Sequence, residues 1–159
     1  MKIHNRKAGF TLIEILVVIG IIAILAAIVI IAINPARQFA QARDTQRRND
    51  ATAILNGIGQ CMADNGGLWN GTDTGCCEGA VDLPAVATAI GTGGVDVAGC
   101  VSAASDVFIP TYISTMPMDP SDGTAIDTGY TIFQDAATNR ITIAAPGTEI
   151  AATPISVTR

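Results

Sequence analysis

The sequence predicts an α+β protein in which a long N-terminal helix packs on a small antiparallel sheet. The first observation is an uninterrupted apolar run over residues 15–33, followed by apolar residues at helical spacing as far as residue 62. The second is a change of composition after residue 66, where Gly, Thr, Ala and Asp dominate. Short apolar segments separated by turn residues favour strands there, and strands laid across one helix define the fold class. The predicted elements of this part are strands at 130–134, 140–144 and 150–157 and a short capped helix at 82–90.

The apolar run is long enough to cross a lipid bilayer. It contains only Ile, Leu, Val, Ala and one Gly. A helix that rises about 1.5 Å per residue spans the hydrocarbon core of roughly 30 Å with about 20 residues. Lys2, Arg6 and Lys7 precede the run. Basic residues before an inserted segment mark its cytoplasmic side, so the rest of the chain is predicted to be exported.

The helix is predicted to be interrupted once, at Asn34-Pro35. Pro35 has no backbone N–H to donate, but it is tolerated as the first residue of a new helix after a capping Asn. We therefore expect a kink at Pro35 and a helix stop at Asn65-Gly66-Gly67. The predicted organisation is an apolar helix over residues 10–33, its amphipathic continuation over 34–65, and a head over 66–159.

The residues before the apolar run form a specific motif. Residues 1–9 are polar and basic and end in Ala8-Gly9, and the run is reached through Gly9-Phe10-Thr11-Leu12-Ile13-Glu14. This segment resembles the prepilin cleavage and methylation motif of bacterial type IV pilins and of the related type II secretion and competence pseudopilins. The resemblance is strong over residues 1–50 and is one of general layout beyond them.

The resemblance implies how the N-terminus is processed. In that family a membrane-embedded aspartyl peptidase removes the basic leader after the glycine, and the new N-terminal residue is N-methylated. Carried over to this sequence, residues 1–9 are the leader, Gly9–Phe10 is the scissile bond and Phe10 is the methylated residue. The implied partners are the prepilin peptidase/methyltransferase, an inner-membrane assembly platform, other pilins and further copies of this chain.

Glu14 is a carboxylate at the edge of the apolar run and needs a partner. A charge in a membrane helix costs about 2.5 kcal/mol or more at the bilayer centre and less near the interface. After cleavage the amine of Phe10 would lie one helical turn from Glu14, which is predicted to neutralise it in the same chain or in a neighbouring subunit. In a filament this pair would set the axial register. The alternative is an interfacial carboxylate without a partner.

Four cysteines, all past the apolar run, predict two disulfides in an exported head. They are Cys61, Cys76, Cys77 and Cys100. A bridge between the neighbours Cys76 and Cys77 is strained, so Cys61 and Cys100 are each expected to take one of them, with both connectivities open. A four-thiolate zinc site usually has two Cys-x-x-Cys pairs, and this chain has none. Free thiols are the third alternative.

The charge pattern argues against an enzyme and against a protein that binds nucleic acid. The only histidine and both lysines lie in the leader, so the mature chain would lack the usual general bases and amine nucleophiles. The chain carries a net charge of -5, and beyond Asp64 its only bases are Arg140 and Arg159. An acidic head repels phosphate backbones.

No cofactor is expected, with calcium as the one candidate to weigh. Asp119, Asp122 and Asp127 place three carboxylates around a Gly turn, and hard oxygen ligands at loop spacing can hold calcium. The segment also looks similar to the C-terminal loop of major pseudopilins, some of which bind calcium there. It lacks the Glu that ends an EF-hand loop. The alternative is an Asx-turn loop without a metal.

These features predict the precursor of a structural subunit of a type IV pilus-like filament, held together by its apolar helices. The chain would lie in the inner (cytoplasmic) membrane, in contact with lipid, and would then enter a cell-surface or periplasmic filament. A type II secretion or competence pseudopilin is the alternative within the same family. A single-pass membrane-anchored extracytoplasmic binding protein is the alternative from another class.

Overall fold

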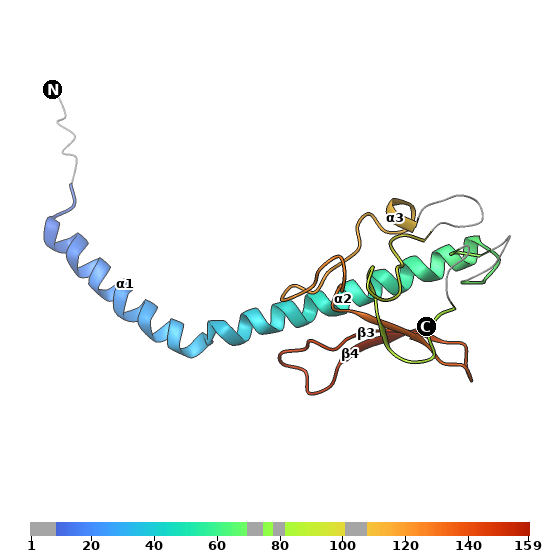
Figure 1. Cartoon of the computed structure of the whole chain (residues 1–159). Helices are drawn as coiled ribbons and strands as arrows, with labels where there is room; N and C mark the ends of the chain where they lie inside the picture. The colour runs from blue at the N-terminus through green and yellow to red at the C-terminus, as the bar shows by residue number, and fades with distance from the viewer. Residues whose placement is uncertain (1–8, 70–74, 78–81, 101–107) are drawn as a thin grey trace, which may run out of the picture. The chain divides into compact units, whose positions relative to one another are not determined.

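The computed structural model describes residues 9–69, 75–77, 82–100 and 108–159 of the chain. Two compact units divide the chain, residues 1–39 and residues 40–159. The first unit holds helix α1 and the start of helix α2, and the second holds the rest of α2 with the sheet (Figure 1).

Helix α1 runs from Leu12 to Ile33 and has no buried residue. Apart from Glu14 in its first turn, its side chains are apolar on every face. α1 ends at Asn34, which adopts the left-handed conformation with φ 47°. Asn is one of the few residues other than Gly that tolerate this region.

Helix α2 runs from Pro35 to Asp64. Asn34 also starts this helix, because its carbonyl and its side-chain Oδ1 both accept the backbone N–H of Arg37, at 3.1 and 3.4 Å. Pro35 fits the first helical position, where no N–H is needed. The turn over Asn65, Gly66 and Gly67 follows the last helical residue, and both glycines have positive φ.

Four antiparallel strands form the sheet in the described part of the chain, in the order β1-β2-β3-β4. The pairing is that of a meander, because each strand is bonded to the next one along the sequence. Ile132 of β2 lies opposite Ile143 of β3, which lies opposite Val157 of β4. The strands are β1 Thr88–Ala89, β2 Thr131–Gln134, β3 Ile141–Ala145 and β4 Ile155–Thr158.

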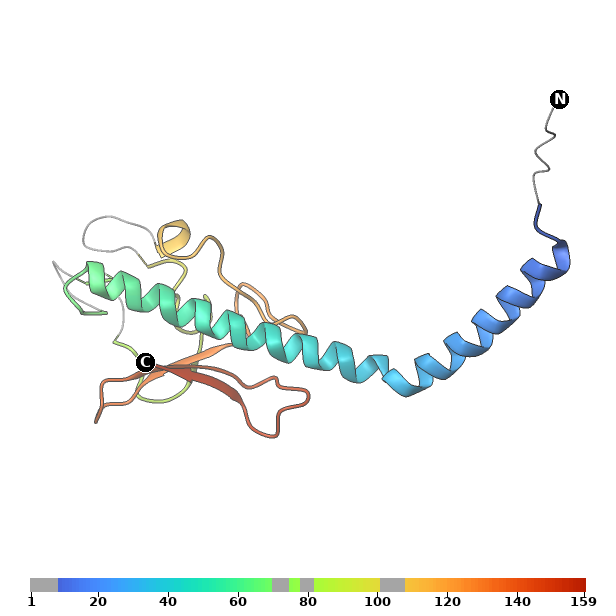
Figure 2. The same ribbon diagram turned by 180° about the vertical axis from the view of Figure 1, so that it is seen from behind.

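The core of the second unit lies between α2 and the sheet, which run side by side in both views (Figures 1 and 2). α2 contributes Ile54, Leu55 and Ile58. Ile58 lies four residues after Ile54 and three after Leu55, so it shares a face of the helix with both. Ile132 and Ile143 of the sheet are completely buried in the same cluster. Burying a side chain of this size contributes about 1.5 to 3 kcal/mol.

The α+β prediction is confirmed, but one predicted element is wrong. Residues 82–90 contain no α-helix, and the edge strand β1 occupies Thr88–Ala89 instead. Thr88 and Ala89 pair with Ile132 and Thr131 of β2. A helix this short is marginal in water, and the unpaired edge of β2 offers hydrogen bonds that override its apolar spacing. The last strand, expected over 150–157, starts only at Ile155, directly after Pro154, and lies at the sheet edge as expected.

Candidate functional site

The segment around the predicted scissile bond is built by the start of α1. Thr11 is the N-cap of α1 and has extended backbone, with φ -85° and ψ 151°. Its Oγ1 accepts the backbone N–H of Glu14 at 3.3 Å, and Glu14 Oε2 accepts the backbone N–H of Thr11 at 3.5 Å. This reciprocal pair is a capping box, which satisfies two groups that every helix start leaves unpaired.

Gly9 and Phe10 lie outside the helix, next to this cap. Phe10 is 80% exposed. A Cβ added to Gly9 would meet no atom within 4 Å, so the described part of this chain imposes no steric need for glycine there. The requirement for Gly9 that the prepilin resemblance implies would therefore come from the peptidase.

The capping box gives Glu14 a contact that the sequence interpretation missed. The pattern Thr-x-x-Glu at residues 11–14 is the known signature of a capping box, so the sequence contained the signal. Phe10 precedes α1 in the uncleaved chain, so its one-turn spacing to Glu14 is not formed here. The pairing of Glu14 with the Phe10 amine stays a prediction for the cleaved chain.

The Arg47 cluster holds the head on α2, and consists of Arg47, Asp44, Asp119 and Glu149. The guanidinium of Arg47 is 1% exposed and forms a two-pronged contact with Asp119, at 2.6 Å from Nε to Oδ2 and 2.9 Å from Nη2 to Oδ1. Its Nη1 donates to Asp44 at 2.8 Å and to Glu149 at 3.1 Å. Arg43, one turn earlier on α2, also pairs with Glu149.

Asp44 ties the connection between β3 and β4 to α2. Its carboxylate accepts the backbone N–H groups of Glu149, Ile150 and Ala151, at 3.0, 2.8 and 3.2 Å. Burial alone would raise the pKa of Asp44, but these three donors and Arg47 outweigh it and lower that pKa to about 2. The ionised carboxylate is therefore part of the folded head.

The other two carboxylates of the cluster are also held in the charged form. The hydrogen bond from Arg43 is the main reason that the pKa of Glu149 is lowered to about 2. The hydrogen bonds from Arg47 lower the pKa of Asp119 against the opposing effect of burial. Of the two, Asp119 is buried, and removing Arg47 would leave its charge without a cation.

The three candidate calcium ligands do not converge in the structure. Asp119 is 5% exposed and is used by Arg47 and by the backbone N–H of Ser121. Asp127 accepts the N–H of Gly129 at 2.9 Å, and Asp122 is exposed. Within the described residues no group of three or more His, Cys, Asp or Glu side chains is placed to hold a metal ion. Calcium binding here stays a prediction, and it would compete with Arg47 for Asp119.

The four cysteines lie in two pairs. Cys61 is bonded to Cys76 and Cys77 to Cys100, with Cα–Cα distances of 5.4 and 4.9 Å that are ordinary for disulfides. This is one of the two connectivities that the sequence left open. Cys61 lies on α2, so the first bridge ties the end of that helix to the segment that follows it.

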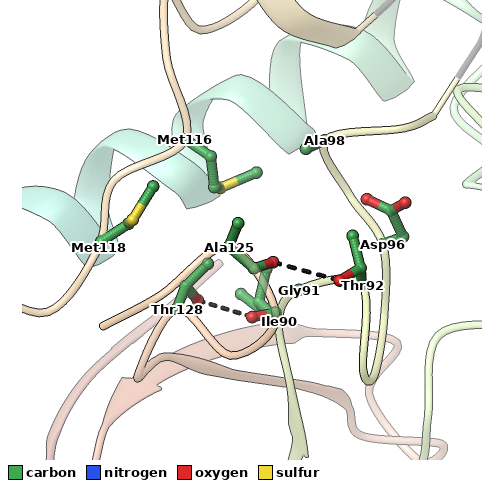
Figure 3. A pocket seen from close by; sticks show the side chains of 9 residues that line it. All are labelled: Ile90, Gly91, Thr92, Asp96, Ala98, Met116, Met118, Ala125 and Thr128. Carbon is green, nitrogen blue, oxygen red and sulfur yellow. Dashed lines mark hydrogen bonds between the residues drawn. The ribbon is translucent and has the colours of Figure 1, made fainter. Parts of the chain in front are cut away.

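A small pocket opens on the head beside Ile90 (Figure 3). Its volume is about 130 Å³, and Met116 and Met118 form much of its apolar wall. The hydroxyl of Thr128 bonds to the carbonyl of Ile90 at 2.7 Å. Ligand sites usually hold 300 Å³ or more, and this pocket is smaller. It does not define a specific ligand.

The geometry first defines a class: an α+β protein whose helix α1 is exposed along its whole length and is long and apolar enough to cross a membrane. The family model of the prokaryotic N-terminal methylation motif matches residues 4–32. The chain therefore carries the prepilin-type motif of type IV pilins and pseudopilins. Searches of curated proteins and of solved structures found no significant match to the chain.

Proposed function

We propose that this chain is the precursor of a structural subunit of a type IV pilus-like filament. The observation that carries the proposal is helix α1, which is apolar on all faces apart from Glu14, has no buried residue and forms most of the matched prepilin-type motif. Such a helix needs an apolar environment that its own chain does not provide. Lipid supplies it before assembly, and the α1 helices of other subunits supply it in the filament.

The processing steps follow from the same segment. A prepilin peptidase cuts the Gly9–Phe10 bond, and the new amine of Phe10 is methylated. Glu14 then neutralises this amine within the chain or in the next subunit, which fixes the axial register. The chain moves from the inner membrane to a cell-surface or periplasmic filament through an assembly platform, and it performs no catalysis.

One observation supports the filament over a membrane-anchored binding protein. An anchored receptor has no use for a cleavage and methylation motif, whereas a filament subunit requires it. A pseudopilin shares every one of these features, and the length of the assembled filament distinguishes it from a pilin.

The variant Glu14→Gln tests the proposal, because Gln keeps the capping oxygen and removes the charge. We expect it to be cleaved and folded like the parent but to yield at least tenfold fewer filaments, since a buried charge pair loses roughly 3 kcal/mol or more when one partner is removed. Filaments are sheared, counted by electron microscopy and normalised to the subunit level in the membrane.

The matched control is Ile15→Leu, which changes shape next to Glu14 without changing charge. It should assemble like the parent. Equal filament yields for Glu14→Gln and the parent would refute the role of the charge. A parent chain that is never found in filaments would refute the proposed function itself.

A further inference from the structure

We propose that the capping box of Thr11 and Glu14 positions the scissile bond by holding the chain extended up to the first turn of α1. Thr11 is then a positioning residue for the cleavage of Gly9–Phe10. This inference rests on the proposed function, because it needs the chain to be a peptidase substrate. The capping box acts in the uncleaved chain, before cleavage creates the amine of Phe10.

The geometry fixes where the helix begins. The Thr11 side chain accepts the N–H of Glu14, while the Thr11 carbonyl accepts the first helical hydrogen bond, from Ile15 at 3.3 Å. Thr11 is therefore the last residue with extended backbone, and Leu12 is the first helical one. The scissile bond lies one residue before the cap and remains outside the hydrogen-bonded turn.

Without the Thr11 hydroxyl the helix has another place to start. Gly9 ranks close to Thr as an N-cap residue, and the segment after it contains no proline that would stop a helix. A helix that began at Gly9 would place Phe10 in its first turn and draw the scissile bond into the helix. An apolar environment increases this tendency, because an unpaired backbone group costs several kcal/mol there.

The helical form is the poorer substrate. Hydrolysis adds one water across the bond, which leaves a carboxylate on Gly9 and an ammonium group on Phe10, and the peptidase must reach the carbonyl carbon of Gly9. Helical backbone must open locally before it is cut. A substrate that is competent only part of the time binds with an affinity reduced by that fraction, so the cap acts on KM and leaves kcat unchanged.

The test measures cleavage of the full-length precursor in lipid vesicles by its prepilin peptidase, for Thr11→Val and Thr11→Ser. Val has nearly the shape of Thr but no hydroxyl, whereas Ser keeps the cap. Loss of one cap changes the ratio of the two forms about fivefold, so Thr11→Val should raise KM by up to about fivefold at unchanged kcat. Thr11→Ser should be cleaved like the parent. Glu14→Gln should also be cleaved like the parent, because Gln completes a capping box.

The outcomes separate the two proposals. If Thr11→Val keeps the KM of the parent, or if Thr11→Ser is as slow as Thr11→Val, the capping box does not position the bond. If Glu14→Gln alone is slow, the charge and not the cap acts in cleavage, and the inference is overturned. If the parent is not cut at Gly9–Phe10, both the proposed processing and the role of the capping box are overturned.

Discussion

Helix α1 and the part of α2 that belongs to the second compact unit, residues 40–64, have opposite sources of stability. None of the 22 residues of α1 is buried, whereas nine residues of α2 are buried, among them the charged Asp44 and Arg47. Apart from Glu14 in its first turn, α1 is apolar on all faces, and something other than the described part of its own chain must cover it. α2 carries many polar side chains, and one of its faces is buried against the rest of its own unit. The comparison shows that the share of apolar side chains on a helix indicates which partner stabilises it.

The largest expected effect is in the head, at Arg47. The variant Arg47→Met should lower the free energy of unfolding of the head by about 3 to 5 kcal/mol, because it leaves Asp44 and Asp119 buried without their cation. Thermal unfolding of the full chain in detergent, followed by near-ultraviolet circular dichroism, measures this. The control Arg48→Met, at an exposed position on the same helix, should change little. Equal melting of both variants would contradict the role of the Arg47 cluster.

The next effect comes from the disulfides. Removing the Cys77–Cys100 bridge with the double variant Cys77→Ser/Cys100→Ser should cost roughly 3 kcal/mol, because the bridge closes a loop with a sequence separation of 23. The helix content of α1 in detergent should stay the same. Non-reducing peptide mapping should join Cys61 to Cys76 and Cys77 to Cys100. A Cys61–Cys77 peptide would contradict this connectivity, and four free or metal-bound thiols would overturn the disulfides.

A pair of glycine substitutions compares the two helices directly. A Cβ at Gly57 of α2 would lie 2.6 Å from Cγ1 of Ile113 and 3.3 Å from Cζ of Phe108. Gly57→Ala should therefore lower the free energy of unfolding by about 1 to 2 kcal/mol, even after the better helix propensity of Ala is included. A Cβ at Gly20 of α1 would meet nothing within 4 Å, so Gly20→Ala should leave the head unchanged. A destabilising Gly20→Ala would show that α1 has support within the chain.

The smallest effect is a difference in acid sensitivity. The pKa of Asp44 and that of Glu149 are lowered to about 2, below the value of about 4 for an unfolded carboxyl. Their contribution is complete above about pH 5 and is lost as the pH falls from about 4 to about 2, because the unfolded chain binds protons first. Asp44→Asn should flatten the dependence of head stability on pH in this window. The exposed Asp64→Asn is the control, and identical pH profiles for Asp44→Asn and the parent would contradict the account.

The sequence predicted most of the features that depend on residues close together in the chain and missed those that depend on residues far apart. The apolar run, the interruption at Asn34-Pro35 and the strands β2 and β3 are local patterns, and the structure shows each of them close to where the sequence places it. The capping box was also local, as Thr-x-x-Glu, and was missed because Glu14 was interpreted only through its charge.

The Arg47 cluster could not be found in this way. Arg47 and Asp119 are 72 positions apart, and Arg47 and Glu149 are 102 apart. No sequence pattern around Arg47, Asp119 or Glu149 indicates that these residues contact one another, so their contacts follow only from the fold. The short helix predicted at residues 82–90 failed for the same reason, because strand β2 supplied hydrogen-bond partners from a distant part of the chain.

The most direct test of the central claim is the intact mass of subunits in sheared filaments, with electron microscopy of the same material. The account predicts filaments whose subunits lack residues 1–9 and begin with Phe10 carrying one added methyl group. Subunits that still carry the leader in assembled material, or a parent chain that stays in the membrane fraction and never forms filaments, would contradict it.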